Sequence, residues 1–204
     1  RLKMPIIQPT ILDLMEYAND AAARAAFVSL GYDSYTKLLL HGDGDAVIDS
    51  ALNKTVTIVN AIQSADQSKF GGKSWYFDGA GDYLSVPDSD DWDFGAGNFT
   101  IDFWINTADA NGVLFDSSTY STAAAGGFCL MLYSGTIRFQ LFSGGGWNNF
   151  TNVDVSACLN NAWHHFALIR NGANVIFYAD GVPLHTIAAM SIDASTGPLK
   201  IGYD

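Results

Sequence analysis

The sequence predicts an all-β protein in which two antiparallel sheets pack face to face, preceded by a short helical arm. Three observations support this fold class. The chain of 204 residues contains 20 glycines and 13% aromatic residues, a composition typical of sheet proteins with many turns. Apolar and polar residues alternate along several segments, which is the period of a half-buried strand. Pairs of the type X-Gly separate these segments, and such pairs are the strongest short-range hairpin signals.

The N-terminal arm, residues 1–35, has a helical rather than an alternating period. Thr10 followed by Asp13 resembles a capping box, and the apolar residues that follow fall on one helical stripe. Asp20 is suited to cap a second helix over residues 21–30, which Gly31 would end. Because isolated helices of this length are marginal in water, we expect the arm to pack on its own domain or on another chain.

The sandwich is predicted over residues 36–204. Residues 38–40 form a short apolar strand, and residues 99–105 alternate between Phe or Ile and their neighbours. Residues 143–147, with three glycines in a row, are predicted to form an exposed, flexible loop. Hairpins are predicted to turn at Ser134-Gly135, Asn171-Gly172 and Asp180-Gly181.

Composition excludes several classes of protein. Hydrophobic residues make up 49% of the chain and charged residues 15%, which excludes a disordered chain. The net charge of −11 would repel a phosphate backbone, so no nucleic-acid partner is expected. No apolar run approaches the ~18 residues of a membrane span, so no membrane insertion is expected. Cys129 and Cys158 do not make a disulfide framework; a buried free thiol at Cys129 and a single bridge both remain open.

A series of short motifs follows in a fixed order along residues 36–204. In chain order they are Leu38-Leu39-Leu40-His41-Gly42-Asp43-Gly44, Phe70-Gly71-Gly72-Lys73-Ser74, Tyr76-Phe77-Asp78-Gly79, Gly81-Asp82-Tyr83-Leu84, Phe99-Thr100-Ile101-Asp102-Phe103-Trp104-Ile105, Trp163-His164-His165-Phe166-Ala167-Leu168, Phe177-Tyr178-Ala179-Asp180-Gly181 and Leu199-Lys200-Ile201-Gly202. This series resembles the laminin G-like jelly roll of the concanavalin A-like lectin/glucanase superfamily. The resemblance implies a two-sheet antiparallel jelly-roll sandwich, and it leaves the function open between adhesion, sugar binding and enzyme-associated roles.

The acidic residues bear on whether the chain is an enzyme. Hydrolases on this scaffold usually carry two Glu residues on one strand, one as nucleophile and one as acid. Of the 21 acidic residues here, 20 are Asp, and the only Glu is Glu16 in the N-terminal arm. We therefore expect no enzymatic activity. The resemblance also implies one further strand after the Ile201-Gly202 motif, so we expect the jelly roll to lack its closing strand.

One loop carries the candidate metal ligands Asp43, Asp45 and Asp49. The resemblance places a structural cation near this region, and the Asp-Gly-Asp spacing lets alternate oxygens converge on one Ca²⁺ ion. A solvated turn, in which the Asp side chains cap local backbone N–H groups, is the alternative interpretation. A second acidic cluster surrounds Trp92, at Asp88, Asp90, Asp91 and Asp93, and is expected to be a solvated loop.

Two tryptophans lie in polar or glycine-rich loops. Trp92 and Trp147 are therefore candidate platforms for stacking against sugar rings, with Asn148 and Asn149 as hydrogen-bonding partners for hydroxyl groups. The alternative is that each ring folds back over a sheet edge. His164 and His165 are adjacent on a predicted strand and so face opposite ways, which favours structural roles for both.

These observations predict a non-catalytic adhesion or carbohydrate-binding module. It would belong to a surface-exposed assembly such as a phage virion fibre or decoration protein, in an extracellular or virion-surface location. Its partners would be a glycan or host surface and other chains of a homo-oligomer, and Ca²⁺ is the expected cofactor. The alternatives are a purely structural assembly subunit, or a glycan-active enzyme or its appended module.

Overall fold

The computed structural model describes residues 35–43, 49–51, 54–118 and 126–203, without the side chains of residues 149–151. The helices expected in residues 1–34 lie outside this part of the chain. The chain divides into two compact units, one of residues 1–54 and 62–76 and the other of residues 55–61 and 77–204. The described residues form strands and two single-turn 3₁₀ helices, which confirms the all-β fold class.

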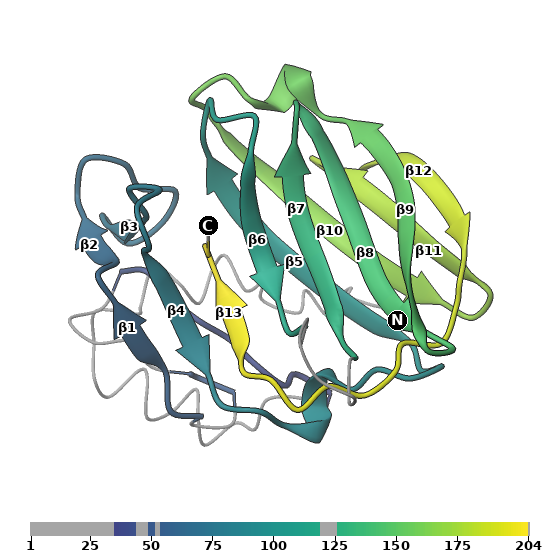
Figure 1. Ribbon diagram of the computed structural model, residues 1–204. Helices are drawn as coiled ribbons and strands as arrows, with labels where there is room; N and C mark the ends of the chain where they lie inside the picture. Colours follow the sequence, from purple (N-terminus) through teal and green to yellow (C-terminus); the bar gives the residue numbers. More distant parts are fainter. Residues whose placement is uncertain (1–34, 44–48, 52–53, 119–125, 204) are drawn as a thin grey trace, which may run out of the picture. The chain divides into compact units, whose positions relative to one another are not determined.

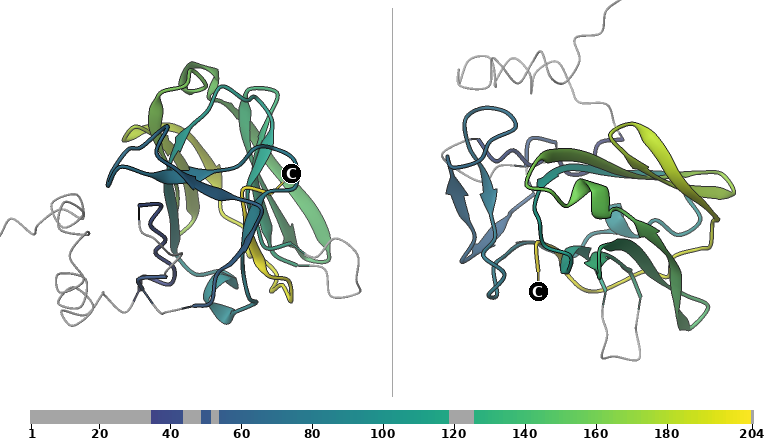
Figure 2. Two further views of the ribbon diagram at one scale, coloured as in Figure 1. Left: turned by 90° about the vertical axis from the view of Figure 1, so that its left-hand side faces the viewer. Right: turned by 90° about the horizontal axis from the view of Figure 1, so that it is seen from above.

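The larger unit contains two antiparallel sheets, which Figures 1 and 2 show as two layers. The seven-stranded sheet comprises, in spatial order, β1 (Thr57–Val59), β4 (Tyr83–Val86), β13 (Leu199–Ile201), β6 (Gly112–Asp116), β7 (Phe128–Tyr133), β8 (Thr136–Ser143) and β9 (Gly146–Asp154). The four-stranded sheet comprises, in spatial order, β12 (Val182–Ala188), β11 (Asn174–Ala179), β10 (Trp163–Asn171) and β5 (Phe99–Asn106).

Aromatic side chains join the inner faces of these two sheets. The Phe99 ring of β5 lies 6.3 Å from the Phe139 ring of β8, and Phe103 lies 5.0 Å from Phe115 of β6 in an edge contact. Phe166 of β10 is fully buried and contacts Phe103 within its own sheet. Alternate residues of each strand therefore form one apolar core between the layers, as the alternating sequence period predicts.

All three predicted hairpins are present, two of them at the predicted turns; the third turns one residue later than predicted, at Gly172 and Ala173, because Asn171 still pairs with Asn174. Ser134 and Gly135 join β7 to β8 with positive φ values of 51° and 78°, and Asp180 and Gly181 join β11 to β12 with values of 49° and 77°. Positive φ at both central residues is the geometry of a tight hairpin turn, which explains why Gly is the second residue of each pair.

The predicted loop at residues 143–147 is a tight hairpin instead. Gly144 and Gly145 form the whole turn, with φ values of 60° and 81°, and Trp147 already lies in β9 opposite Phe142. The composition suggested a flexible loop, but two consecutive glycines also satisfy the positive φ values of a two-residue turn.

The smaller unit holds a short antiparallel pair, β2 (Ile62–Ser64) and β3 (Ser74–Tyr76). The strand predicted at residues 38–40 is wrong among the described residues: Leu40 forms only an isolated bridge with Asp49. The side chain of Asp49 explains this geometry, because its carboxylate accepts the backbone N–H groups of Leu39, Ala51 and Lys54. A buried carboxylate, rather than a partner strand, thus holds this segment.

Candidate functional site

The outward face of β8 and its neighbouring strands carries a row of aromatic and polar side chains. Along β8 the even-numbered residues are half-buried, whereas Ile137, Phe139 and Leu141 between them are buried in the core. Strand register brings outward residues of β7 and β9 beside this row. We call these side chains the outer strip: Tyr133, Arg138, Phe142, Trp147 and Asn152.

Specific contacts hold the outer strip in place at both ends. The guanidinium carbon of Arg138 lies 3.6 Å from the centre of the Tyr133 ring, and Arg138 Nε donates a hydrogen bond of 2.5 Å to Asn152 Oδ1. At the other end, Phe142 and Trp147 meet edge to face, with ring centres 5.5 Å apart. The rings and the guanidinium plane are therefore positioned by packing before any ligand arrives.

The dimensions of the outer strip suit an extended ligand. Thr136 and Phe142 are six residues apart on β8, which corresponds to about 20 Å along the strand. Aromatic rings lie at both ends, and donors and acceptors of Arg138 and Asn152 lie between them. Tyr133 is 49% exposed, so its ring also offers surface to solvent. Such a row can stack against apolar faces of a ligand and hydrogen-bond its hydroxyl groups.

The expectation of an exposed stacking ring at Trp92 is wrong. Trp92 is only 3% exposed, in the 3₁₀ helix η1 (Asp90–Trp92). Ser89 caps this helix by accepting the Asp91 N–H, and Asp93 accepts the Ser195 N–H. The Asp93 carboxylate thus bonds a distant backbone group and the Asp91 carboxylate the Ser89 hydroxyl, and the short helix turns the Trp92 ring into the interior.

The two asparagines after Trp147 have different places. Asn148 lies opposite Leu141, and its amide nitrogen donates to the carbonyl oxygens of Ser143 and Gly146 within the hairpin turn. It therefore braces the turn. The backbone of Asn149 pairs with Gln140 in the outward register, while its side chain lies outside the described residues. Of the four predicted ligand-binding residues, Trp147 is the one that the structure places in the outer strip.

Of the two predicted calcium ligands that the structure describes, Asp43 has the carboxylate that is free of hydrogen bonds from the described residues. Both of its carboxylate oxygens are shielded from solvent and accept no hydrogen bond within the described residues. The carboxylate packs against the backbone of Gly71, where an added Cβ would lie 2.1 Å from Asp43 Oδ2. A buried, unpaired carboxylate is costly, and a bound cation is one way to offset that cost. Asp49 fits less well because three backbone N–H groups occupy its oxygens, and Asp45 lies outside the described residues.

Sequence comparison places the chain in a family. The family model described as the concanavalin A-like lectin/glucanases superfamily, of laminin G type, matches residues 78–204, which is more than half of the chain. The chain belongs to the concanavalin A-like lectin/glucanase superfamily. A search of curated proteins gave no match. The match covers the larger unit almost entirely, so the matched residues form the jelly-roll sandwich on which the outer strip lies.

Solved structures share this concanavalin A-like fold at low sequence identity. A mutant of HCR/D has a TM-score of 0.61 and 16% identity, with 82% of this chain and 43% of that chain covered. The binding domain of botulinum neurotoxin DC in complex with SialylT has a TM-score of 0.57 and 18% identity, with 81% and 42% covered. A third structure comes from work on botulinum neurotoxin type C, a toxin whose cell entry depends on two ganglioside molecules. It has a TM-score of 0.56 and 16% identity, with 88% of this chain and 45% of that chain covered. The chain thus spans less than half of each, and at these identities the likeness establishes the fold.

Several outer-strip residues were missed by reasoning from the sequence. Tyr133, Arg138 and Asn152 lie on strands, whereas the sequence criterion for sugar-stacking residues selected aromatic residues in loops. The signal that could have found them is the alternation in residues 136–142, where Arg138 and Phe142 occupy the face opposite the core residues. No helix in the described part of the concanavalin A-like chain is long and apolar enough to cross a membrane.

Proposed function

We propose that the chain is a non-catalytic carbohydrate-binding or adhesion module whose ligand lies along the outer strip. The observation that carries the proposal is the row from Tyr133 through Arg138 to Trp147, in which aromatic rings flank fixed polar groups. Sugars present alternating apolar faces and hydroxyl groups, which match such a row. Membership of a superfamily that contains lectins supports this assignment, and the jelly roll itself does not decide it.

The charge of the molecule narrows the ligand class. A net charge of −11 disfavours strongly anionic polymers, whose approach it would slow and whose binding it would weaken. Arg138 is already engaged by the Tyr133 ring and by Asn152, so it offers a planar donor more than an unpaired charge. We therefore expect a neutral or weakly charged oligosaccharide several rings long.

A single shallow face of this kind binds weakly, so a useful adhesion module needs several copies. We propose that the chain works in a homo-oligomer at an extracellular or virion surface, such as a phage fibre or decoration protein. Linking several sites raises the overall avidity without any new contact. Light scattering of the full chain tests the assembly: a multimer is expected, and a monomer at working concentration would contradict it.

The binding proposal is tested with a glycan array followed by affinity measurements on the best ligand. Tyr133→Ala should weaken binding by about twofold to thirteenfold, because a well-placed aromatic contact contributes about 0.5–1.5 kcal/mol beyond its area. Tyr76→Ala is the matched control, since Tyr76 is 52% exposed against 49% for Tyr133 and lies in the other unit. Equal losses for both variants, or no array signal with the parent protein, would contradict binding along the outer strip.

The non-catalytic part of the proposal needs its own test. Residues 35–204 contain no Glu, so the paired-Glu mechanism of glycan hydrolysis has no residues to use there. We expect no release of reducing ends from the polysaccharides related to the array ligands. Hydrolysis that persists in a Glu16→Ala variant would show an Asp-based enzyme and would favour the alternative function.

We propose in addition that a divalent cation of the calcium type binds at Asp43. The shielded, unpaired carboxylate of Asp43 supports this, because Ca²⁺ takes carboxylate and carbonyl oxygens as ligands. Such an ion would supply charge compensation in the smaller unit and would take no part in ligand chemistry on the outer strip. Loss of a Ca²⁺-dependent rise in melting temperature on Asp43→Asn tests this proposal.

A further inference from the structure

Three potential metal ligands of different chemistry meet beside the four-stranded sheet. Cys158 ends the 3₁₀ helix η2 (Ser156–Cys158), His164 lies on β10, and Asp180 lies in the turn between β11 and β12. One ligand atom from each residue lies within 4.8 Å of the others. None of these three residues belongs to the outer strip, and the proposed glycan function does not use them.

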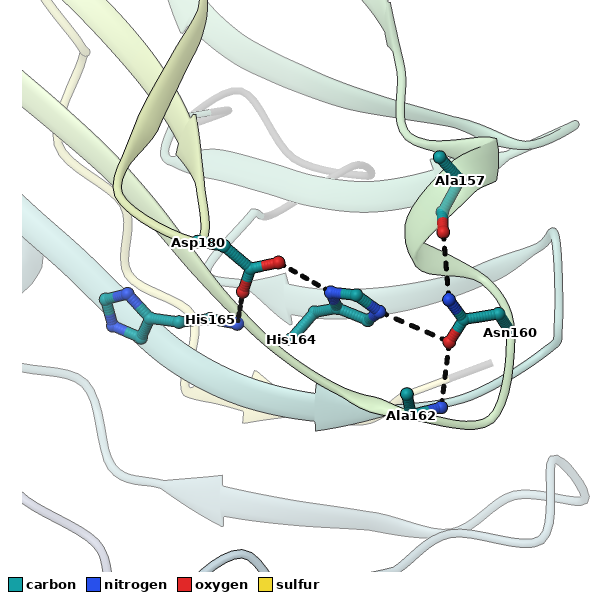
Figure 3. Close-up of polar contacts among 6 residues, drawn as sticks. All are labelled: Ala157, Asn160, Ala162, His164, His165 and Asp180. Atoms are coloured by element: carbon teal, nitrogen blue, oxygen red, sulfur yellow. Dashed lines mark hydrogen bonds and ion pairs between the residues drawn. The ribbon is translucent and has the colours of Figure 1, made fainter.

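The ring of His164 is held between two acceptors, as Figure 3 shows. Its Nδ1 lies 2.7 Å from Asp180 Oδ2, and its Nε2 lies 3.2 Å from Asn160 Oδ1. The orientation of the Asn160 amide is fixed, because Oδ1 accepts the Ala162 N–H and Nδ2 donates to the Ala157 carbonyl. A neutral imidazole has one N–H donor, so it can satisfy only one of these two acceptors.

Backbone bonds fix the positions of the other groups. Asp180 Oδ1 accepts the His165 N–H at 2.9 Å, and the Asp180 N–H donates to the His165 carbonyl at 2.8 Å. His165 itself turns to the other face, where its ring lies 5.2 Å from Trp104. The cluster therefore presents sulfur, carboxylate oxygen and an imidazole nitrogen from rigidly held segments, with acceptors in excess of donors.

We propose that a divalent transition-metal ion of the zinc type binds here, held by Cys158 Sγ, His164 Nδ1 and Asp180 Oδ2, with water as fourth ligand. The ion would displace the proton that lies between His164 Nδ1 and Asp180 Oδ2, and this proton would pass through solvent to His164 Nε2. The Cys158 thiol would release its own proton to solvent as the sulfur–metal bond forms. His164 Nε2–H would then donate to Asn160 Oδ1, so both ring nitrogens of His164 would have a partner. Asn160 is in this scheme a positioning residue, of the kind that orients metal-bound imidazoles.

The geometry and the ligand types favour this class of ion. Tetrahedral Zn²⁺, with bonds of 2.0–2.3 Å, separates its ligand atoms by about 3.5 Å. This value lies between the 2.7 Å from His164 Nδ1 to Asp180 Oδ2 and the 4.8 Å within which one ligand atom of each residue lies. Thiolate and imidazole select zinc-like ions over Ca²⁺ and Mg²⁺, which prefer oxygen.

The test is a Co²⁺ titration of the full chain under reducing conditions, with Ca²⁺ in excess to occupy any oxygen-only site. We expect a near-ultraviolet thiolate-to-cobalt charge-transfer band that Zn²⁺ abolishes by displacement. Cys158→Ser should remove the band and weaken Zn²⁺ binding at least about tenfold, and Asn160→Ala should weaken it by about tenfold. His185→Gln, on the exposed strand β12, is the control and should change neither.

A second measurement keeps the proposal open to contradiction if a variant is unstable. In the parent protein Zn²⁺ should slow the modification of Cys158 by a thiol reagent, while Cys129, which is 1% exposed, stays unreactive in both states. Absence of the cobalt band together with unchanged thiol reactivity would show that the cluster is only a hydrogen-bonded brace. Equal Zn²⁺ affinity in the parent and Cys158→Ser proteins would likewise overturn the proposal.

Discussion

Two segments with similar sequence patterns place their tryptophan side chains in opposite environments, one buried and one on an outward face. Residues 88–93 and 143–149 each place a tryptophan among small, polar or glycine residues. In the first, Trp92 is 3% exposed inside the core region. In the second, Trp147 lies on the outward face of the edge strand β9 and contacts Phe142 edge to face.

Backbone hydrogen bonding explains the difference. The Trp92 segment is a 3₁₀ turn whose carboxylates and hydroxyl groups bond backbone N–H groups, and this turn points the ring inward. The Trp147 segment is a two-residue hairpin, so strand register decides the direction of each side chain. Local composition shows that a tryptophan lies near a chain reversal, but the type of reversal decides whether its ring is available to a ligand.

The largest expected effect separates the two tryptophans by stability. Trp92→Ala should lower the free energy of unfolding by about 3–5 kcal/mol, because it leaves a large cavity in a packed interior. Trp147→Ala should cost less than about 2 kcal/mol, since part of its ring is already in contact with solvent, and it should weaken glycan binding instead. Urea denaturation of both variants measures this. Equal losses of stability would contradict the different burial of the two rings.

Much of the fold could be predicted because its signals are local. The alternation in residues 99–105 and the X-Gly pairs at 134–135 and 180–181 report strand and turn geometry directly, and the pair at 171–172 locates its turn to within one residue. The candidate site could be predicted only in part, since Arg138 and Asn152 meet through register across β8 and β9. Likewise, the cluster of Cys158, His164 and Asp180 joins three segments that no sequence motif links. The role of Asp49 was missed because a side chain, and not a partner strand, accepts the backbone N–H groups of Leu39, Ala51 and Lys54.

The acidic residues near Trp92 also differ from Asp43 in the smaller unit. Asp91 and Asp93 bond groups within the protein, whereas the Asp43 carboxylate is shielded and unpaired among the described residues. Asp43→Asn should therefore raise the melting temperature in chelator, because it removes a buried charge. It should also abolish the rise in melting temperature that Ca²⁺ gives the parent, which corresponds to a gain of about 2.7 kcal/mol in the free energy of unfolding at 100 times the dissociation constant.

The control for this experiment is Asp91→Asn, whose parent carboxylate already has a partner in Ser89. That variant should keep the full calcium response. If Ca²⁺ shifts the melting temperature of the parent and of Asp43→Asn equally, the ion binds elsewhere. If Ca²⁺ shifts neither, no stabilising calcium site exists in this protein.

Two arginines extend the same contrast between an interior and an outward role. Arg170 is 7% exposed, and its Nη1 donates to the carbonyl oxygens of Gly95 and Met190, which fastens the chain just after Trp92. Arg170→Met should lower the free energy of unfolding by about 1–3 kcal/mol, because two carbonyl groups lose their donor. Arg138→Met should change stability by less than about 1 kcal/mol and should weaken glycan binding. Chemical denaturation measures the stability of both variants, and the affinity assay measures their glycan binding. Arg170→Met should lose mainly stability, and Arg138→Met should lose mainly binding.

The smallest expected effect concerns the end of the strand that carries Trp147. The pKa of Asp154 is held below its ordinary value, first by the backbone N–H of Ser156 and then by the Ser156 hydroxyl. A carboxyl group with a lowered pKa in the folded state stabilises the protein at pH values above its unfolded pKa of about 3.9. That contribution is lost as the pH falls through the folded pKa.

Asp154→Asn should therefore lower the urea midpoint slightly at neutral pH, and the difference from the parent should vanish in strong acid. The effect should be smaller than for any variant above, because the carboxylate is fully exposed and its bonds compete with water. Asp109→Asn is the control, since it also lies in an exposed turn and its own backbone N–H bonds Thr107. A loss in Asp154→Asn that is equally large in acid and at neutral pH would place its cause in altered packing of the β9 end, where charge plays no part.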